Sequence, residues 1–166
     1  MKKGVTLIEL IIVLLIVGIL SSLTYIAFSS QNVLRLDAAA RKVAVDLMYV
    51  RNLSLSMAKW YGVSFEANPA NSYTAYETDG STDTIIPDPS RGDNFVVNLF
   101  QQFGQTKISS INIGAGKKVE FHPLGIPYTD KNGLAITTTG LISLEYAGAY
   151  RTVAITPNTG NIEVLP

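Results

Sequence analysis

The sequence contains no cysteine in its 166 residues. Disulfide bonds and thiolate metal sites are therefore excluded. It also has no surplus of either charge, because lysine plus arginine and aspartate plus glutamate number 13 each. The basic surplus that is typical of nucleic-acid-binding proteins is absent, so we expect no nucleic acid among the partners.

The sequence also lacks the motifs of common catalytic sites. No G-x-S-x-G elbow is present. The stretch "GAGKK" at 114–118 lacks the upstream glycine and the hydroxyl residue of a phosphate-binding loop. His122 is the only histidine; it lies two residues from Glu120, so the two could share one strand face, but two ligands do not make a metal site. We expect no enzymatic activity and no cofactor.

Charge is absent from Leu10 to Leu34, and proline is absent before Pro69. A bilayer core is crossed by roughly 20 apolar residues in a helix, and this segment is longer. Lys2 and Lys3 precede it, which places the N-terminus in the cytoplasm by the positive-inside rule. The pattern predicts a single membrane-spanning helix over 5–30.

Glu9 places a carboxylate at the head of this apolar run. A charge inside the bilayer costs about 2.5–3.5 kcal/mol on insertion scales, so Glu9 either has a partner or reaches the headgroups. A plain membrane anchor would explain the span but not Glu9. A cleaved secretory signal is the other alternative, but at "TYIAF" Tyr25 stands where such a signal has a small residue.

The helical pattern continues beyond the predicted span. Apolar residues and one serine recur at steps of three and four, namely Val33, Leu36, Ala40, Val43, Leu47, Val50, Ser54 and Met57. The charged residues, Asp46 and Arg51 among them, lie largely off this stripe. This spacing predicts an amphipathic helix over 31–60 that packs on a soluble domain. We expect one helix from about Val5 to Lys59, roughly 80 Å long.

The remaining segment, 61–166, has sequence patterns that are typical of β-strands. "YGVSFEA" and "SYTAYET" alternate around "NPAN" and predict a hairpin. The loop "DGSTDTIIPDPSRGDN" follows. Further short strands are predicted at "VVNLF", "KISSINI", "KKVEFHP", "LAITTTG", "LISLEY", "YRTVAITP" and "NIEVLP". No useful helical pattern occurs after residue 60, so the predicted fold is α+β, with a long N-terminal helix on an antiparallel sheet.

The N-terminal stretch "KKGVTLIEL" resembles the class III signal of type IV pilins and pseudopilins. The resemblance implies that residues 1–4 are a leader that prepilin peptidase removes after Gly4. Val5, where phenylalanine is more usual, would then be the first mature residue and would be N-methylated. Glu9 would be the fifth mature residue, which in this family pairs with the N-terminal amine of a neighbouring subunit. Opposite charges attract strongly at low dielectric, which fits a Glu9–Val5 charge pair between subunits.

The C-terminal part is similar to the GspH/FimT family of minor pseudopilins and minor pilins. The similarity depends on a phenylalanine–x–proline–x–glycine turn and a final "TG" hairpin, here Phe121, Pro123, Gly125, Thr159 and Gly160. Some relatives bind DNA through arginines near this hairpin. In this chain no arginine follows Arg151, and phosphate binding needs a denser basic patch.

The loop at 79–93 contains one further candidate site. Asp79, Ser81 and Asp83 stand at alternate positions, and oxygen ligands on a loop suit calcium. The EF-hand pattern fails, because Thr84 replaces the required glycine and Ser90 the bidentate glutamate. A solvated acidic loop is the ordinary interpretation of this stretch, so we expect no metal.

The sequence therefore predicts a minor pilin or pseudopilin that is anchored in the inner membrane by a single span, with its C-terminal domain on the periplasmic or extracytoplasmic side. Its expected partners are prepilin peptidase and other pilin or pseudopilin subunits, contacted through the N-terminal helix. It would join a type II secretion pseudopilus or a type IV pilus near the tip and initiate assembly. The alternatives are a DNA-uptake or adhesive minor pilin, and a membrane-anchored periplasmic domain unrelated to pili.

Overall fold

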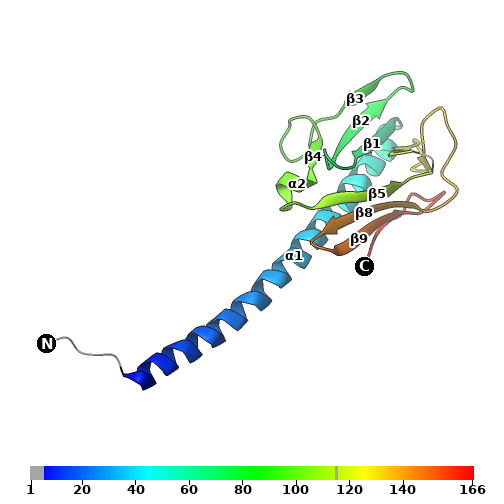
Figure 1. Cartoon of the computed structure of the whole chain (residues 1–166). Helices are drawn as coiled ribbons and strands as arrows, with labels where there is room; N and C mark the ends of the chain where they lie inside the picture. Colours follow the sequence, from blue (N-terminus) through cyan, green and yellow to red (C-terminus); the bar gives the residue numbers. More distant parts are fainter. Residues whose placement is uncertain (1–5, 115) are drawn as a thin grey trace. The chain divides into compact units, whose positions relative to one another are not determined.

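The computed structural model describes residues 6–114 and 116–166, and for residues 22–30 it describes the backbone only. The chain divides into two compact units, Met1–Leu34 and Arg35–Pro166. Helix α1 (Leu7–Met57) contributes residues to both units. Figure 1 shows the helices and strands, most of them with their labels.

The observed bounds of α1 agree with the predicted helix, except that Val5 lies outside the described residues. Thr6 caps the start of the helix, because its carbonyl oxygen accepts from the Leu10 N–H at 3.3 Å and its Oγ1 from the Glu9 N–H at 3.4 Å. Such side-chain acceptance satisfies an N–H group that has no partner within the helix. At the other end Ala58 has a φ of 54°, the left-handed conformation that commonly terminates helices.

The described part of the first unit exposes its apolar side chains. The large apolar residues between Leu7 and Leu20 are all exposed, from 48% at Ile16 to 78% at Leu7. In the part of the chain that the structure describes, no helix reaches the combination of length and hydropathy that crossing a membrane requires. The spanning helix at 5–30 stays a prediction.

In the second unit, α1 buries most of the predicted stripe. Leu36, Ala40, Val43, Leu47, Val50 and Ser54 are at most 1% exposed. The two ends of the stripe, Val33 and Met57, are exposed. The placement of Asp46 off the stripe was wrong, since this carboxylate is buried beside Tyr73.

The first sheet follows α1 and has the strand order β3-β2-β1-β6-β7, with β4 also paired to β2. Its strands are β1 (Trp60–Glu66), β2 (Ser72–Thr78), β3 (Asp83–Ile85), β4 (Val96–Asn98), β6 (Lys118–Phe121) and β7 (Pro127–Tyr128). The predicted hairpin is confirmed: β1 and β2 pair antiparallel with Val63 opposite Ala75.

The second sheet is antiparallel, with the order β10-β9-β8-β5. Its strands are β5 (Lys107–Asn112), β8 (Gly140–Tyr146), β9 (Ala149–Ile155) and β10 (Ile162–Leu165). Buried side chains of both sheets and of α1 form one apolar core, which includes Val43, Leu47, Phe65, Phe121 and Ile142. The α+β class that the sequence predicted is confirmed.

Three local predictions were wrong. In "VVNLF" the strand β4 ends at Asn98, and Leu99–Gln102 form the short helix α2, because the Asn98 side chain accepts from the Gln101 N–H at 2.9 Å and caps it. The predicted loop after β2 contains β3, whose Thr84 lies opposite Glu77. In "LAITTTG" only Ala135 makes an isolated bridge, to Tyr128, before Gly140 begins β8.

Candidate functional site

The first candidate site is the N-terminal segment. Gly4 and Val5, the predicted cleavage and methylation positions, lie outside the described residues. Glu9 lies in the first turn of α1 and is exposed. Its carboxylate has no hydrogen-bond or ion-pair partner within the described part of the chain. The partner that was predicted for it, the amine of Val5 in another subunit, is not part of this structure.

The surroundings of Glu9 are apolar. On one side of it lies Ile8, which is 66% exposed, and on the other Leu10, which is 55% exposed. An exposed apolar surface of this length is typical of a segment that contacts a membrane or another protein. A carboxylate at the head of such a segment would lose its water when the segment is buried, so it needs a positive partner there.

The second candidate region is formed by the two C-terminal turn motifs, which the fold brings together. Arg51 of α1 lies between them: its Nε donates to the Gly125 carbonyl at 3.2 Å and its Nη2 to the Thr159 carbonyl at 2.8 Å. Gly125 and Gly160 have φ values of 75° and 65°. The sequence motifs named the glycines, but nothing local pointed to Arg51, because its partners are far along the chain.

The first of these turns also has internal hydrogen bonds. The Gly125 N–H donates to the His122 carbonyl at 2.7 Å, and the Leu124 N–H donates to His122 Nδ1 at 3.0 Å. Phe121, which precedes the turn, is fully buried in the core. The motif therefore anchors β6 at Phe121 and turns the chain back towards β7.

Glu120 and His122 do not form a joint site. Glu120 is buried and accepts from the Tyr76 hydroxyl and Lys118 Nζ, both at 2.9 Å, and from the Lys131 N–H at 2.5 Å. His122 instead contacts two rings, at centroid distances of 5.0 Å from Trp60 and 6.0 Å from Tyr128. Each side chain thus has its own partners, and the carboxylate and the imidazole do not converge on a ligand.

The acidic loop uses the carboxylate of Asp79 to close its own turn. Asp79 Oδ1 accepts from the N–H groups of Ser81 and Thr82 at 2.8 and 2.7 Å, and these bonds lower the pKa of Asp79. Asp83 belongs to β3. Over residues 6–114 and 116–166, no three histidine, cysteine, aspartate or glutamate residues are grouped to hold a metal ion. That the candidate calcium ligands Asp79, Ser81 and Asp83 hold no metal stays a prediction.

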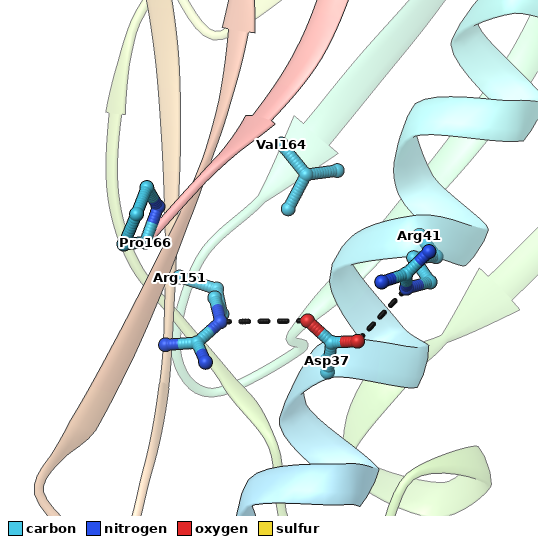
Figure 2. A pocket seen from close by; sticks show the side chains of 5 residues that line it. All are labelled: Asp37, Arg41, Arg151, Val164 and Pro166. Carbon is cyan, nitrogen blue, oxygen red and sulfur yellow. Dashed lines mark hydrogen bonds and ion pairs between the residues drawn. The ribbon is translucent and has the colours of Figure 1, made fainter.

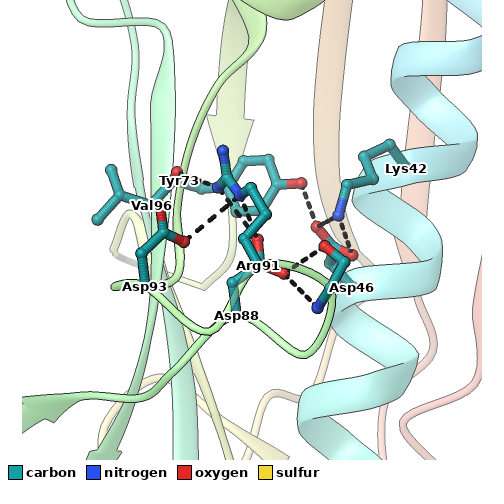
Figure 3. A network of polar contacts seen from close by, with 8 residues as sticks. Lys42, Asp46, Tyr73, Asp88, Arg91, Asp93 and Val96 are labelled. Carbon is teal, nitrogen blue, oxygen red and sulfur yellow. Dashed lines mark hydrogen bonds and ion pairs between the residues drawn. The ribbon is translucent and has the colours of Figure 1, made fainter.

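Figure 3 shows two sets of polar contacts, one that joins α1 to β2 and one within the loop before β4. Asp46 accepts from Lys42 Nζ at 2.7 Å and from the Tyr73 hydroxyl at 2.5 Å. Asp88 is buried and accepts from Ser90 and from the Arg91 guanidinium. Burial opposes the charge of Asp88, but the bonds from Ser90 and Arg91 outweigh it and hold its pKa at about 2. Burial also raises the pKa of Tyr73, and neighbouring Asp46 adds to the effect.

The chain combines an N-terminal methylation motif with a pilin-like fold. Residues 1–25 match the family described as "Prokaryotic N-terminal methylation motif". An N-terminal helix followed by an antiparallel-sheet domain is the pilin-like architecture. The prediction of a pilin-like α+β fold is confirmed.

Two solved proteins have a similar fold. The fold is similar to the minor pseudopilin EpsH from the type 2 secretion system of Vibrio cholerae, with a TM-score of 0.59, 12% identity and coverage of 79% of this chain and 96% of that one. It is also similar to the type IV minor pilin FimU of Pseudomonas aeruginosa, with a TM-score of 0.54, 16% identity and coverage of 79% and 93%. No curated protein matches the sequence.

These findings confirm the predicted resemblance to type IV pilin-like minor pseudopilins and minor pilins. The likeness to EpsH and FimU lies in the fold, because the sequence identities are low. The narrower assignment to the GspH/FimT family stays a prediction.

Proposed function

We propose that this chain is a structural minor pilin-like subunit that assembles with other pilin or pseudopilin subunits. The observation that carries the proposal is the methylation motif over residues 1–25, with Glu9 at the head of an exposed apolar helix. The pilin-like fold of the rest of the chain supports it. We propose that the chain has no catalytic activity.

In this proposal prepilin peptidase cleaves after Gly4, and the new N-terminus at Val5 is methylated. Each subunit is held in the inner membrane by the span at 5–30, with residues 61–166 outside the cytoplasm. Lys2 and Lys3 on the cytoplasmic side favour this orientation. The subunit then leaves the membrane for a type II secretion pseudopilus or a type IV pilus, where it initiates assembly at or near the tip.

The driving interaction is the charge pair between Glu9 of one subunit and the amine of Val5 in its neighbour. Either charge alone is costly to keep in an apolar environment, and removal of one partner leaves the other unpaired. Docking beside another subunit supplies the missing charge and covers the exposed apolar side chains between Leu7 and Leu20.

The substitution Glu9→Val tests this role. The variant should still be inserted and cleaved, because the leader and the apolar run remain, but it should enter filaments at a small fraction of the normal amount. Immunoblots of sheared filaments and of membranes measure the two pools. The matched control is Glu163→Val, which removes an exposed carboxylate from β10 and should assemble normally. Normal incorporation of the Glu9→Val chain would refute the charge-pair mechanism.

A further inference from the structure

An open cleft of about 370 Å³ lies in the second unit between α1 and the C-terminal strands. It is lined by Asp37 and Arg41 of α1, Arg151 of β9, Val164 of β10, and Pro166. Figure 2 shows Asp37 between the two arginines. No motif of the sequence pointed to this cleft, because it joins residues more than a hundred positions apart.

Three charged side chains line the cleft, and one carboxylate faces two guanidinium groups. Asp37 Oδ2 accepts from Arg41 Nε at 2.8 Å, and its Oδ1 lies 3.5 Å from Arg151 Nε. The hydrogen bond from Arg41 and the charge of both arginines hold the pKa of Asp37 below its usual value, so it stays ionised. Two positive side chains and one negative leave a net side-chain charge of +1.

Several guanidinium N–H groups of the two arginines make no hydrogen bond within the described residues. A guanidinium has five N–H groups, and here only the Nε of each arginine faces Asp37. Nη1 of Arg151 donates to the Tyr150 carbonyl at 2.9 Å. Within the described residues, Nη2 of Arg151 and both Nη atoms of Arg41 have no acceptor. The Arg41 side chain is 73% exposed, so its donors are accessible.

We propose that this cleft binds the carboxylate of an aspartate or glutamate side chain from a neighbouring pilin-like subunit. The proposal rests on the proposed function, since it names a partner contact within the same assembly. The planar guanidinium group of an arginine can bind a carboxylate with two parallel N–H···O hydrogen bonds. Val164 and Pro166 offer an apolar edge against which the methylene groups of such a side chain can pack.

The charge favours a single carboxylate over a nucleic acid. Binding to a phosphate backbone needs several cations along a track, each neutralising one phosphate. The cleft has a net side-chain charge of only +1, and Asp37 at its centre would repel a chain of phosphates. One carboxylate, in contrast, would neutralise the surplus charge and use the open donors.

A photo-crosslinking experiment on the full chain in its native cells tests the proposal. A benzophenone amino acid replaces Val164 in the cleft, and in a second sample it replaces Leu134, which is 82% exposed and does not line the cleft. Mass spectrometry of the purified adducts identifies the captured peptide. We expect Val164 to capture a peptide of a pilin-like subunit that contains aspartate or glutamate, and Leu134 not to capture this peptide.

Charge variants show whether the arginines hold the peptide. Arg41→Gln keeps the Arg151–Asp37 contact, so it should preserve the fold, and the adduct yield should fall about two- to fivefold, as expected for loss of a partly exposed ion pair. Lys107→Gln removes an exposed positive charge from β5 and should leave the yield unchanged. Changing the captured acidic residue to arginine should restore the yield in an Arg41→Glu chain.

Three results would overturn the proposal: an unchanged yield in Arg41→Gln, adducts only with lipid or nucleic acid, or no adduct in chains that have entered filaments. The last result would leave the proposed function intact, because incorporation is measured in the same cells. If instead the chain keeps Met1 and never enters filaments, the proposed function fails as well.

Discussion

Gly160 places the C-terminal hairpin close to the turn after β6. A Cβ atom at this position would overlap the Gly125 carbonyl oxygen and come within 2.9 Å of Arg51 Nε. The φ of 65° adds a conformational cost for any residue with a side chain. Glycine is therefore required at position 160 for two reasons: the backbone conformation is left-handed, and there is no space for a Cβ atom.

Gly160→Ala should lower the free energy of unfolding of the full chain by about 2–4 kcal/mol, since strain and overlap add. Urea denaturation followed by tryptophan fluorescence measures this, because Trp60 is the only tryptophan. Gly148→Ala is the matched control: its φ of 81° is equally unfavourable, but nothing lies within 4 Å of the new Cβ. Equal losses in both variants would mean that the contact with Gly125 contributes nothing.

Asp88 makes the stability of the domain depend on pH in the acidic range. Its folded pKa of about 2 lies below the ordinary 3.8, so ionised Asp88 stabilises the fold above about pH 4. This contribution should be lost as the pH falls from about 4 to 2. Asp88→Asn should therefore be less stable than the natural chain by about 1–3 kcal/mol at pH 7, and the gap should narrow towards pH 2. A gap that is the same at pH 7 and pH 2.5 would contradict this assignment.

At the residue scale, the sequence revealed those residues whose roles depend on their neighbours in the chain. Gly125 and Gly160 were singled out because they match short turn motifs of the family that the C-terminal part resembles. Arg51, Asp46 and Arg151 were not assigned their contacts, because each acts on a partner that only the tertiary fold brings near. In the sequence, a charged side chain that is solvated on a helix or strand looks the same as one that makes a buried hydrogen bond.

At the scale of the element, α1 has an apolar face against the sheets and an exposed face. Val43 and Val45 are the same residue type on these two faces, with 0% and 60% exposure. Val43→Ala should lower the free energy of unfolding by about 1–3 kcal/mol, since it removes buried carbon atoms and leaves a cavity. Val45→Ala should change it by less than about 0.5 kcal/mol. Similar effects in the two variants, measured by urea denaturation, would refute the orientation of the helix.

The elements differ in how well their sequences specify them. The helix and the β1–β2 hairpin were predicted closely, because their periods of 3.6 and 2 extend over many residues. The short elements β3, α2 and β7 were missed or misassigned. They contain two to four residues each, too few for a period, and they depend on the strand or side chain beside them.

At the scale of the whole molecule, the two units have opposite surface chemistry. The described part of Met1–Leu34 exposes apolar side chains around Glu9, whereas Arg35–Pro166 has a buried core and polar networks. This division fits a subunit that assembles through one segment and presents the other. The run without charge ends at Leu34, next to this boundary, whereas the predicted boundaries at 30–31 and 60–61 stay predictions.

The central claim is that the chain is processed and assembled as a pilin-like subunit, and the most direct test is its mature N-terminus. Mass spectrometry of the protein from its native membrane should find a chain that begins at Val5 and carries one methyl group on its amine. A Gly4→Leu chain from the same cells should retain Met1 and serves as the control. A natural chain that begins at Met1, or near Phe28, would contradict the account and leave Glu9 without a partner.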